Sequence, residues 1–236
     1  MMIEISGLKA GYIKGSHVLQ GLSMAIDKGQ SVALMGRNGM GKTTLMRSIV
    51  GHLQASAGTI RFDGADITNR PPYRIARAGI GYVPQGRDIF HDFTVEENLR
   101  MGLLGKPGLG TQVPAWAYEM FPILEERRSQ RAGTMSGGQQ QQLAIMRALL
   151  GKPQLLILDE PSEGIQPSIV HDIGTALRRY ADTQGLTVLL VEQNLDLVSL
   201  LAHHALFMEN GTIVERVDDI SRLHDDPDLI NRYLTV

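Results

Sequence analysis

Short, continuously apolar runs recur along the chain and end at glycine or at acidic residues. The clearest are SVALM (31–35), LLILD (155–159) and TVLLV (187–191). Runs that are apolar throughout, rather than alternating, are typical of strands buried on both faces of a parallel sheet. Helix-forming segments separate these runs. The pattern therefore predicts an α/β fold in which helices cover both faces of a parallel sheet.

Other strand segments have a different pattern. The segments 2–12 and 17–26 alternate partly between apolar and polar residues and are interrupted by glycine, which indicates antiparallel strands. Two further short strands are expected at 58–64 and at 80–85, the latter stopped by Pro84. A hairpin is expected over 204–216, because Asn210-Gly211 is a favoured two-residue turn between strands.

Helix signals fill the remaining segments. They include a proline-started helix at 71–79 and a capping box at the start of 94–104. The other expected helices begin at Lys42 or cover 116–128, 136–150, 168–183 and part of 225–236, and the glycine- and proline-rich segment 105–114 reads as a loop. We therefore expect one domain with three parts. These are a core with a β subdomain (1–85 and 154–217), a helical insertion (86–153) and a helical tail (218–236).

Composition narrows the class of protein. The 236 residues are 43% apolar and 20% charged, as in an ordinary globular domain, and the formal net charge is -2. No basic run is visible, so nucleic acid is not expected as a partner. The absence of cysteine excludes disulfides and thiolate metal sites. No apolar run approaches the roughly 20 residues that cross a bilayer, and the start of the chain lacks the pattern of a secretory signal.

The segment GRNGMGKTT (36–44) matches the phosphate-loop pattern G-x-x-x-x-G-K-[ST]. It follows a predicted strand and precedes a predicted helix, which is the context this motif needs. Its glycines let backbone N–H groups surround a polyphosphate, the lysine adds charge, and the first threonine can bind Mg²⁺. We expect the nucleotide to be bound by Gly36, Arg37, Asn38, Gly39, Gly41, Lys42, Thr43 and Thr44.

Asp159 and Glu160 end a buried strand, at the sheet edge where α/β proteins bind ligands. Asp159 would hold Mg²⁺, directly or through water, and Glu160 would polarise the attacking water. Taken alone, the pair could also be an ordinary strand end followed by an acidic helix start.

Ser136-Gly137-Gly138 stands immediately before a long apolar helix and is followed by Gln139. Ser136 and Gln139 can form a capping box. Two glycines at a positive helix end also expose backbone N–H groups that suit an anion such as a phosphate. Ser136 can serve both purposes, so the residues leave the two interpretations open.

Five motifs in this order resemble those of the ATP-binding subunits of ABC transporters. They are GRNGMGKTT, VPQGR (83–87), MSGGQ (135–139), LLILDEP (155–161) and SEGIQPS (162–168). The resemblance covers nearly the whole chain, and SGGQ is its specific element. It implies a phosphate-loop NTPase fold with a RecA-like parallel core, an antiparallel β subdomain and a helical subdomain that carries the signature.

The resemblance also implies the chemistry. Two subunits would pair head to tail, each binding ATP and Mg²⁺, and Ser136, Gly137, Gly138 and Gln139 of one subunit would cap the other's γ-phosphate. The implied metal ligands are Thr43, Gln85 and Asp159, and the implied catalytic residues are Glu160, Gln85 and Gln193. Tyr12 would stack on adenine, with a packed core aromatic as the alternative. The segment after Gln85 would form part of a groove for a membrane subunit, with a surface turn as the alternative.

One position departs from the family pattern. Many members carry a histidine that contacts the γ-phosphate where this chain has Gln193. Glutamine can donate a hydrogen bond but cannot carry the positive charge of histidine. The departure places more weight on Glu160, and the sequence VEQN resembles the importer branch for hydrophobic and polar amino acids and amides.

Within that branch the motifs look most like those of the urea importer ATPase, so urea or a short amide is the expected solute. The alternative is a branched-chain amino-acid importer, for which we expect fewer glutamines after SGGQ and a different loop after DEP. The expected partners are a second ATPase subunit, membrane permease subunits and, indirectly, a solute-binding protein. The expected location is the cytoplasmic face of the inner membrane. An ABC protein without membrane partners and a regulatory module that scarcely hydrolyses ATP remain as alternatives.

Overall fold

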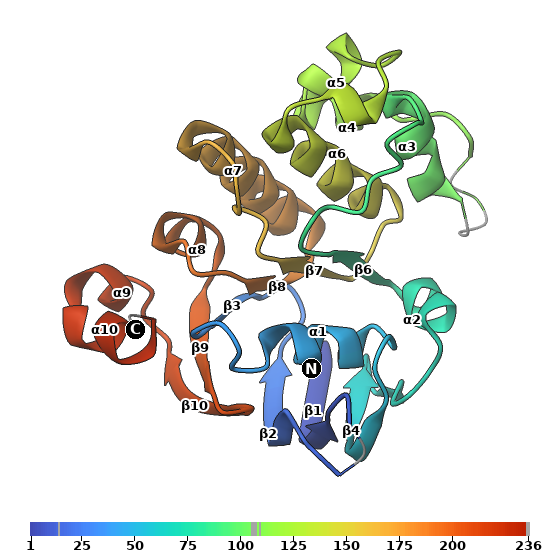
Figure 1. Cartoon of the computed structure of the whole chain (residues 1–236). Coiled ribbons are helices and arrows are strands. Elements are labelled where there is room, and N and C mark those ends of the chain that lie inside the picture. Colours follow the sequence, from blue (N-terminus) through green and yellow to red (C-terminus); the bar gives the residue numbers. More distant parts are fainter. Residues whose placement is uncertain (14, 105–107, 109, 235–236) are drawn as a thin grey trace.

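A computed structural model describes residues 1–13, 15–104, 108 and 110–234. Within these residues the main sheet has six strands in the order β10-β9-β3-β8-β7-β6 (Figure 1). All neighbouring strands run parallel except the β9–β10 pair. The strand bounds are β3 Ser31–Met35, β6 Ile80–Val83, β7 Leu155–Asp159, β8 Thr187–Val191, β9 His204–Glu209 and β10 Thr212–Val217. The prediction that the apolar runs form a parallel sheet is confirmed.

Burial on both faces of this sheet explains why its strands are apolar throughout. On β7, Leu156 and Leu158 belong to one hydrophobic cluster, which also includes residues from the helices between positions 95 and 201. Leu155 and Ile157 belong to a second cluster with the antiparallel strands and the helix Lys42–Ile49. Alternate residues of a strand point to opposite faces, so each needs an apolar side chain here.

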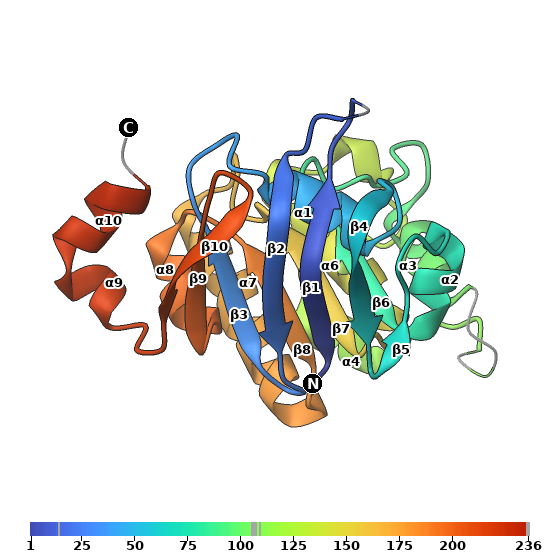
Figure 2. The same ribbon diagram turned by 90° about the horizontal axis from the view of Figure 1, so that it is seen from below.

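The second sheet contains four described strands in the order β2-β1-β4-β5 and is antiparallel, as predicted. Its strand bounds are β1 Ile3–Ala10, β2 Leu19–Ile26, β4 Ala55–Phe62 and β5 Ala65–Asp66. Helix α1, Lys42–Ile49, contacts both β1 and β7 and packs between the two sheets (Figure 2). Strand β4 begins earlier than predicted, because Ala55 pairs with Ala10.

Helices gather on the opposite face of the main sheet and beyond its β6 edge (Figure 1). Their bounds are α2 Pro72–Ala78, α3 Val95–Leu103, α4 Ala115–Met120, α5 Ile123–Glu126, a 3₁₀ turn Ala132–Thr134, α6 Gly137–Leu150, α7 Pro167–Gln184 and α8 Leu195–Leu201. The helical material predicted over 116–128 forms two short helices, α4 and α5, rather than one. Pro122 cannot continue the helix, and Phe121 before it leaves the helical conformation (φ −135°, ψ 85°). In the predicted loop, positions 105–107 and 109 lie outside the described residues.

The C-terminal segment forms two short helices, α9 Arg222–Asp225 and α10 Pro227–Tyr233, beside the β9–β10 hairpin (Figures 1 and 2). The Asp226 carboxylate caps α10 by accepting a hydrogen bond from the Leu229 N–H. The predicted hairpin turn is confirmed, with positive φ at both Asn210 and Gly211. Positions 235 and 236 of the predicted tail lie outside the described residues.

Candidate nucleotide site

The strand order collects the predicted site residues at one edge of the main sheet. Strands β3, β8, β7 and β6 are parallel neighbours, so their carboxyl ends lie at the same edge. The phosphate loop follows β3, Gln193 follows β8, Glu160 follows β7 and Gln85 follows β6. Segments far apart in the sequence therefore meet where α/β proteins bind ligands.

Close packing against β9 explains the first and last glycines of the phosphate loop. Gly36 has a φ of 146°, and a Cβ atom there would lie 2.4 Å from the Met208 carbonyl oxygen. Gly41 has a φ of 107° and precedes α1, where a Cβ atom would lie 2.9 Å from Met208 Cε. Only glycine fits both positions without displacing backbone. The loop is thus held at the N-terminus of α1, where a helix favours anions.

Lys42 lies beneath this loop with only 5% of its surface exposed. Its Nζ atom donates hydrogen bonds to the carbonyl oxygens of Gly36 and of Arg37, the latter at 3.0 Å. Burial lowers the pKa of Lys42, while Glu160, Asp159 and Glu192 oppose that change because their negative charges favour the ammonium form. The loop and the surrounding carboxylates hold the lysine where its charge can reach a polyphosphate.

Asp159 is 2% exposed and accepts a hydrogen bond from the Tyr82 hydroxyl at 3.2 Å. Burial raises the pKa of Asp159, and the Tyr82 hydrogen bond and the Lys42 charge act in the opposite direction. The pKa of Tyr82 is raised first by its own burial and then by Asp159, so the hydroxyl keeps its proton and remains a donor. Tyr82 was not among the predicted site residues, although it lies on β6, the strand that leads to Gln85.

Glu160 and Gln85 are in direct contact. Gln85 Nε2 donates to Glu160 Oε2 at 3.1 Å and to Glu163 Oε2 at 2.9 Å. Glu160 has a φ of 48°, an uncommon conformation for a residue with a side chain, and its N–H donates to the Val191 carbonyl. Burial is the main cause that raises the pKa of Glu160, and Lys42 opposes it. A strained backbone that presents a carboxylate is common at functional sites.

Gln193 contacts the phosphate loop, because its Nε2 donates to Asn38 Oδ1 at 2.8 Å. The preceding Glu192 is buried, and its carboxylate accepts hydrogen bonds from three backbone N–H groups, at Ser162 (3.2 Å), Gln193 (2.8 Å) and Asn194 (3.0 Å). Glu192 therefore fixes the backbone after β8 to the loop after β7. It was missed as a site residue, although it stands in the quoted motif VEQN.

The predicted metal ligands are suited to Mg²⁺. Thr43, Gln85 and Asp159 offer oxygen atoms, which Mg²⁺ prefers. Among the residues that the structure describes, no group of three or more histidine, cysteine, aspartate or glutamate side chains could hold a metal. A site with one carboxylate fits a magnesium ion that keeps waters and binds substrate phosphates rather than an all-protein cage.

The signature forms the predicted capping box. The Ser136 N–H donates to Gln139 Oε1 at 3.0 Å, and the Gln139 N–H donates to Ser136 Oγ at 3.4 Å. Ser136 is exposed, and a Cβ atom at Gly138 would lie 2.8 Å from the Ile169 side chain on α7. Within the described part of the chain, no hydrogen bond joins this signature to the phosphate loop. The cap leaves the helix N-terminus open to an anion from elsewhere.

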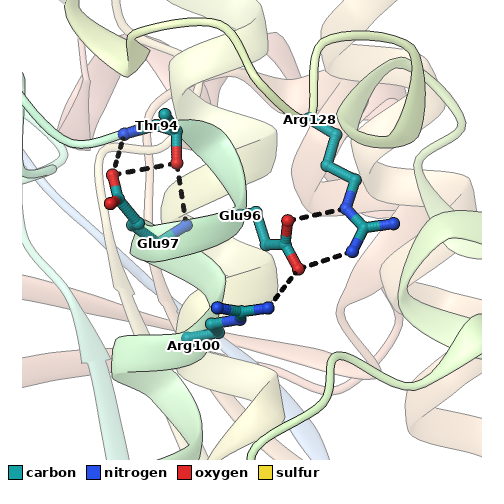
Figure 3. Close-up of polar contacts among 5 residues, drawn as sticks. All are labelled: Thr94, Glu96, Glu97, Arg100 and Arg128. Carbon is teal, nitrogen blue, oxygen red and sulfur yellow. Dashed lines mark hydrogen bonds and ion pairs between the residues drawn. The ribbon is translucent and has the colours of Figure 1, made fainter.

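An ion-pair cluster fixes the segment that leads to the signature (Figure 3). The Glu96 carboxylate accepts hydrogen bonds from Arg128 at 2.6 and 2.7 Å and from Arg100 at 2.7 Å. The hydrogen bond from Arg128 is the main cause that lowers the pKa of Glu96. Thr94 and Glu97 form the predicted capping box beside it. The start of α3 and the segment before Ser136 are thus held together.

The side chains of two predicted nucleotide-binding residues, Tyr12 and Arg37, interact with residues outside the predicted site. Tyr12 is 56% exposed, with the Arg47 guanidinium 5.9 Å from the centre of its ring, so the alternative of a packed core aromatic is wrong. Adenine stacking by Tyr12 stays a prediction. The Arg37 guanidinium is directed to the carbonyl end of α10, where it donates to Asn231 and Arg232.

A phosphate loop, a buried aspartate and an adjacent glutamate at one sheet edge define a phosphate-loop nucleoside triphosphatase. The comparisons give the family. The family model described as ABC transporter matches residues 19–163. The chain belongs to the ABC transporter family, as an ATP-hydrolysing cassette.

Individual relatives agree with this family. The chain is 44% identical over 218 residues to the high-affinity branched-chain amino acid transport ATP-binding protein BraG of Pseudomonas aeruginosa, with 92% of each chain covered. It is 35% identical over 214 residues to the probable branched-chain amino acid transport ATP-binding protein LivF of Archaeoglobus fulgidus, with 90% of each covered. A crystal structure of the ADP conformation of MJ1267, an ATP-binding cassette of an ABC transporter, superimposes with a TM-score of 0.81 at 29% identity, covering 98% of this chain and 97% of that one.

These findings support the prediction of an ABC importer ATPase. For the solute, they support the branched-chain amino-acid alternative better than the prediction of urea. Both curated relatives above are named for branched-chain amino-acid transport. Within the described residues, no helix is both long and apolar enough to cross a bilayer.

Proposed function

We propose that this chain is the ATPase subunit of a membrane importer and that the transported solutes are branched-chain amino acids. The observation that carries the ATPase chemistry is the contact between Gln85 and Glu160, beside Asp159 and Lys42, at the carboxyl edge of the sheet. The names of the relatives support the solute class.

Each residue of the site has a role in phosphoryl transfer. Lys42 and the N–H groups of the phosphate loop bind the β- and γ-phosphates, and Glu160, oriented by Gln85, positions the attacking water. Mg²⁺, held by Thr43, Asp159 and Gln85, would neutralise charge on the phosphate oxygens. Gln193, which donates to Asn38 of the phosphate loop, would donate a hydrogen bond to the γ-phosphate. Phosphoryl transfer depends chiefly on such positioning and charge neutralisation.

A second ATPase subunit completes the site in this proposal. Ser136 is exposed and caps α6 without contacting the phosphate loop of its own chain. Its hydroxyl and the N–H groups of the two following glycines lie at the N-terminus of α6, which carries a partial positive charge. Such a helix end suits the γ-phosphate bound to the other subunit. ATP would therefore close a dimer, and hydrolysis would reopen it.

A groove beside Gln85 is the proposed contact with the membrane subunits. A cavity of about 570 Å³ lies between α2, β6, α3 and α6. Four large apolar residues of its lining are partly exposed, with 36% to 63% of their surface accessible, namely Tyr73, Phe90, Met101 and Leu104. Apolar side chains gathered around a groove are typical of a docking site for an amphipathic helix. We infer that a helix of the permease occupies this groove.

Arg87 connects the groove to the site. This residue lines the groove, and its guanidinium donates to the Glu163 carbonyl and to Gln140 Oε1, each at 3.4 Å. A Cβ atom at Gly137 would lie 3.0 Å from Arg87 Nη2, so the guanidinium also lies against the signature. Glu163 in turn accepts a hydrogen bond from Gln85. A helix that moved Arg87 would therefore move residues of both half-sites.

The proposal is tested by measuring ATPase activity of the complex purified with its membrane subunits, with solute-loaded binding protein added. Stimulation by leucine and not by urea is the expected result. Stimulation by urea alone would keep the mechanism and overturn the solute class. If the chain copurifies with no membrane subunit and responds to neither solute, the transport proposal fails, and an ABC protein that works without a membrane partner replaces it.

A further inference from the structure

One residue of the phosphate loop turns away from the place where phosphates would bind. The Arg37 Nη2 atom donates to the carbonyl oxygens of Asn231 and Arg232, each at 3.4 Å. Arg37 Nε is buried without a hydrogen-bond partner among the described residues. These carbonyls belong to the last turn of α10, where the partial negative charge of a helix attracts a cation. The guanidinium thus joins the phosphate loop to residues that lie 194 and 195 positions further along the chain.

Helix α10 is itself fixed to the sheet next to the loop. Tyr233 is 5% exposed, and its ring centre lies 4.9 Å from that of Phe207 on β9. Phe207 pairs in register with Met35, the last residue of β3, which immediately precedes the phosphate loop. The residue on which α10 packs and the residue that precedes the phosphate loop are therefore neighbours on adjacent strands of the main sheet.

The Arg37 backbone carries this contact to Lys42, which is proposed to bind the phosphates. Its carbonyl oxygen accepts hydrogen bonds from Lys42 Nζ at 3.0 Å and from the Met40 N–H at 3.4 Å. A displacement of Arg37 would therefore displace an acceptor of the Lys42 ammonium and the peptide that closes the loop. The contacts run from the carbonyl end of α10 through Arg37 to Lys42.

We propose that Arg37 is a positioning residue, which fixes the phosphate loop to the C-terminal helix α10 and so makes the tail (218–234) a determinant of ATP affinity. The proposal takes ATP binding from the proposed function and does not depend on transport or on the solute. It assigns the Arg37 side chain to α10; the prediction that Arg37 takes part in binding the nucleotide then rests on its backbone N–H. If the Arg37 side chain contacted ATP itself, its removal would lower ATP affinity while changes to the tail would not.

The test is a double-mutant cycle on the full-length chain, with the Kd for Mg-ATP and the KM and kcat for hydrolysis as readouts. Arg37→Ala removes the guanidinium, and Tyr233→Ala removes the ring that docks α10. Each is expected to raise the Kd and the KM for ATP by about tenfold, with kcat changed by less than about twofold, because the chemical groups are untouched. The Kd of the double variant is expected to be no higher than that of the single variant with the higher Kd, since both changes break the same connection.

Matched variants separate this connection from simple loss of structure. Tyr233→Phe keeps the ring and is expected to bind ATP like the wild type. Asp226→Ala removes the α10 cap and the ion pair with Arg222 at a partly exposed position, so the chain should remain folded while ATP affinity falls by a smaller factor. Asp226→Ala in the Arg37→Ala background should cause no further loss.

Several results would overturn the proposal. If Arg37→Ala weakens ATP binding while Tyr233→Ala and Asp226→Ala do not, Arg37 contacts the nucleotide itself. If the effects of the two sites multiply, Arg37 and the tail act independently. If neither change alters the Kd, the contact has no part in binding. Because the Kd is measured without membrane subunits, a failure of transport coupling leaves these readings intact.

Discussion

Replacing Glu160 by glutamine isolates the negative charge of the proposed water-positioning residue. Glutamine has nearly the same shape, and its side-chain oxygen can still accept the hydrogen bond that Gln85 donates at 3.1 Å. The phosphate loop, Lys42 and Asp159 are unchanged. Glu160→Gln should therefore bind ATP normally and fail in hydrolysis.

The magnitude follows from the role of the charge. Loss of general-base assistance typically lowers a rate by about 10²- to 10⁴-fold, which corresponds to about 2.7 to 5.4 kcal/mol of activation free energy. ATP affinity should stay equal or rise, because a negative charge beside the phosphates has been removed. The ATP-bound dimer should accumulate, since its reopening depends on hydrolysis.

The assay is steady-state ATPase activity together with size-exclusion chromatography in Mg-ATP. The matched control is Glu163→Gln, because Glu163 accepts from the same Gln85 nitrogen at 2.9 Å but is exposed. Glu163→Gln should retain activity within a fewfold of the wild type. Near-normal turnover of Glu160→Gln, or equal losses in both variants, would refute the assignment of Glu160.

Two further predictions concern stability. Asn98→Ala should lower the unfolding free energy by about 2–4 kcal/mol in guanidinium titrations, because the fully buried Asn98 amide hydrogen-bonds both backbone groups of Phe90 and the carbonyl of Thr94; a loss below about 1 kcal/mol would contradict this. Burial lowers the pKa of His204, so the unfolded chain binds a proton more readily, and stability should fall as the pH drops through and below about 6.5. His204→Leu should remove up to about 1.4 kcal/mol per pH unit from that slope, and an unchanged slope would exclude His204 as the cause.

The parts of the fold that the sequence predicts are those set by local chemistry. Apolar runs bounded by glycine or acidic residues mark the buried strands, and a capping box marks the start of α6. The phosphate loop is recognisable because its glycine spacing and its lysine match a known pattern, directly after an apolar run. Helical character over 116–128 was predicted, whereas its division into α4 and α5 at Pro122 was not.

The contacts that hold the site together were not predictable in the same way. Tyr82 reaches Asp159 across 77 residues, and Arg37 reaches α10 across more than 190. No periodicity encodes such pairs, because they depend on which strands become neighbours in the sheet. The motifs also could not predict the solute class, since they contain residues that bind and hydrolyse ATP and none that is assigned a contact with the solute.

In the proposed dimer, each nucleotide site combines the phosphate loop of one subunit with the signature of the other. Two variants test it. Lys42→Ala disables the phosphate loop, and Ser136→Asp keeps a good helix cap while placing a negative charge against the γ-phosphate. Each alone should be inactive. Mixed in equal amounts, they should recover about a quarter of wild-type ATPase activity, because half of the dimers contain one intact site of two. A mixture that stays as inactive as its parents, while both variants still form mixed dimers, would contradict the claim.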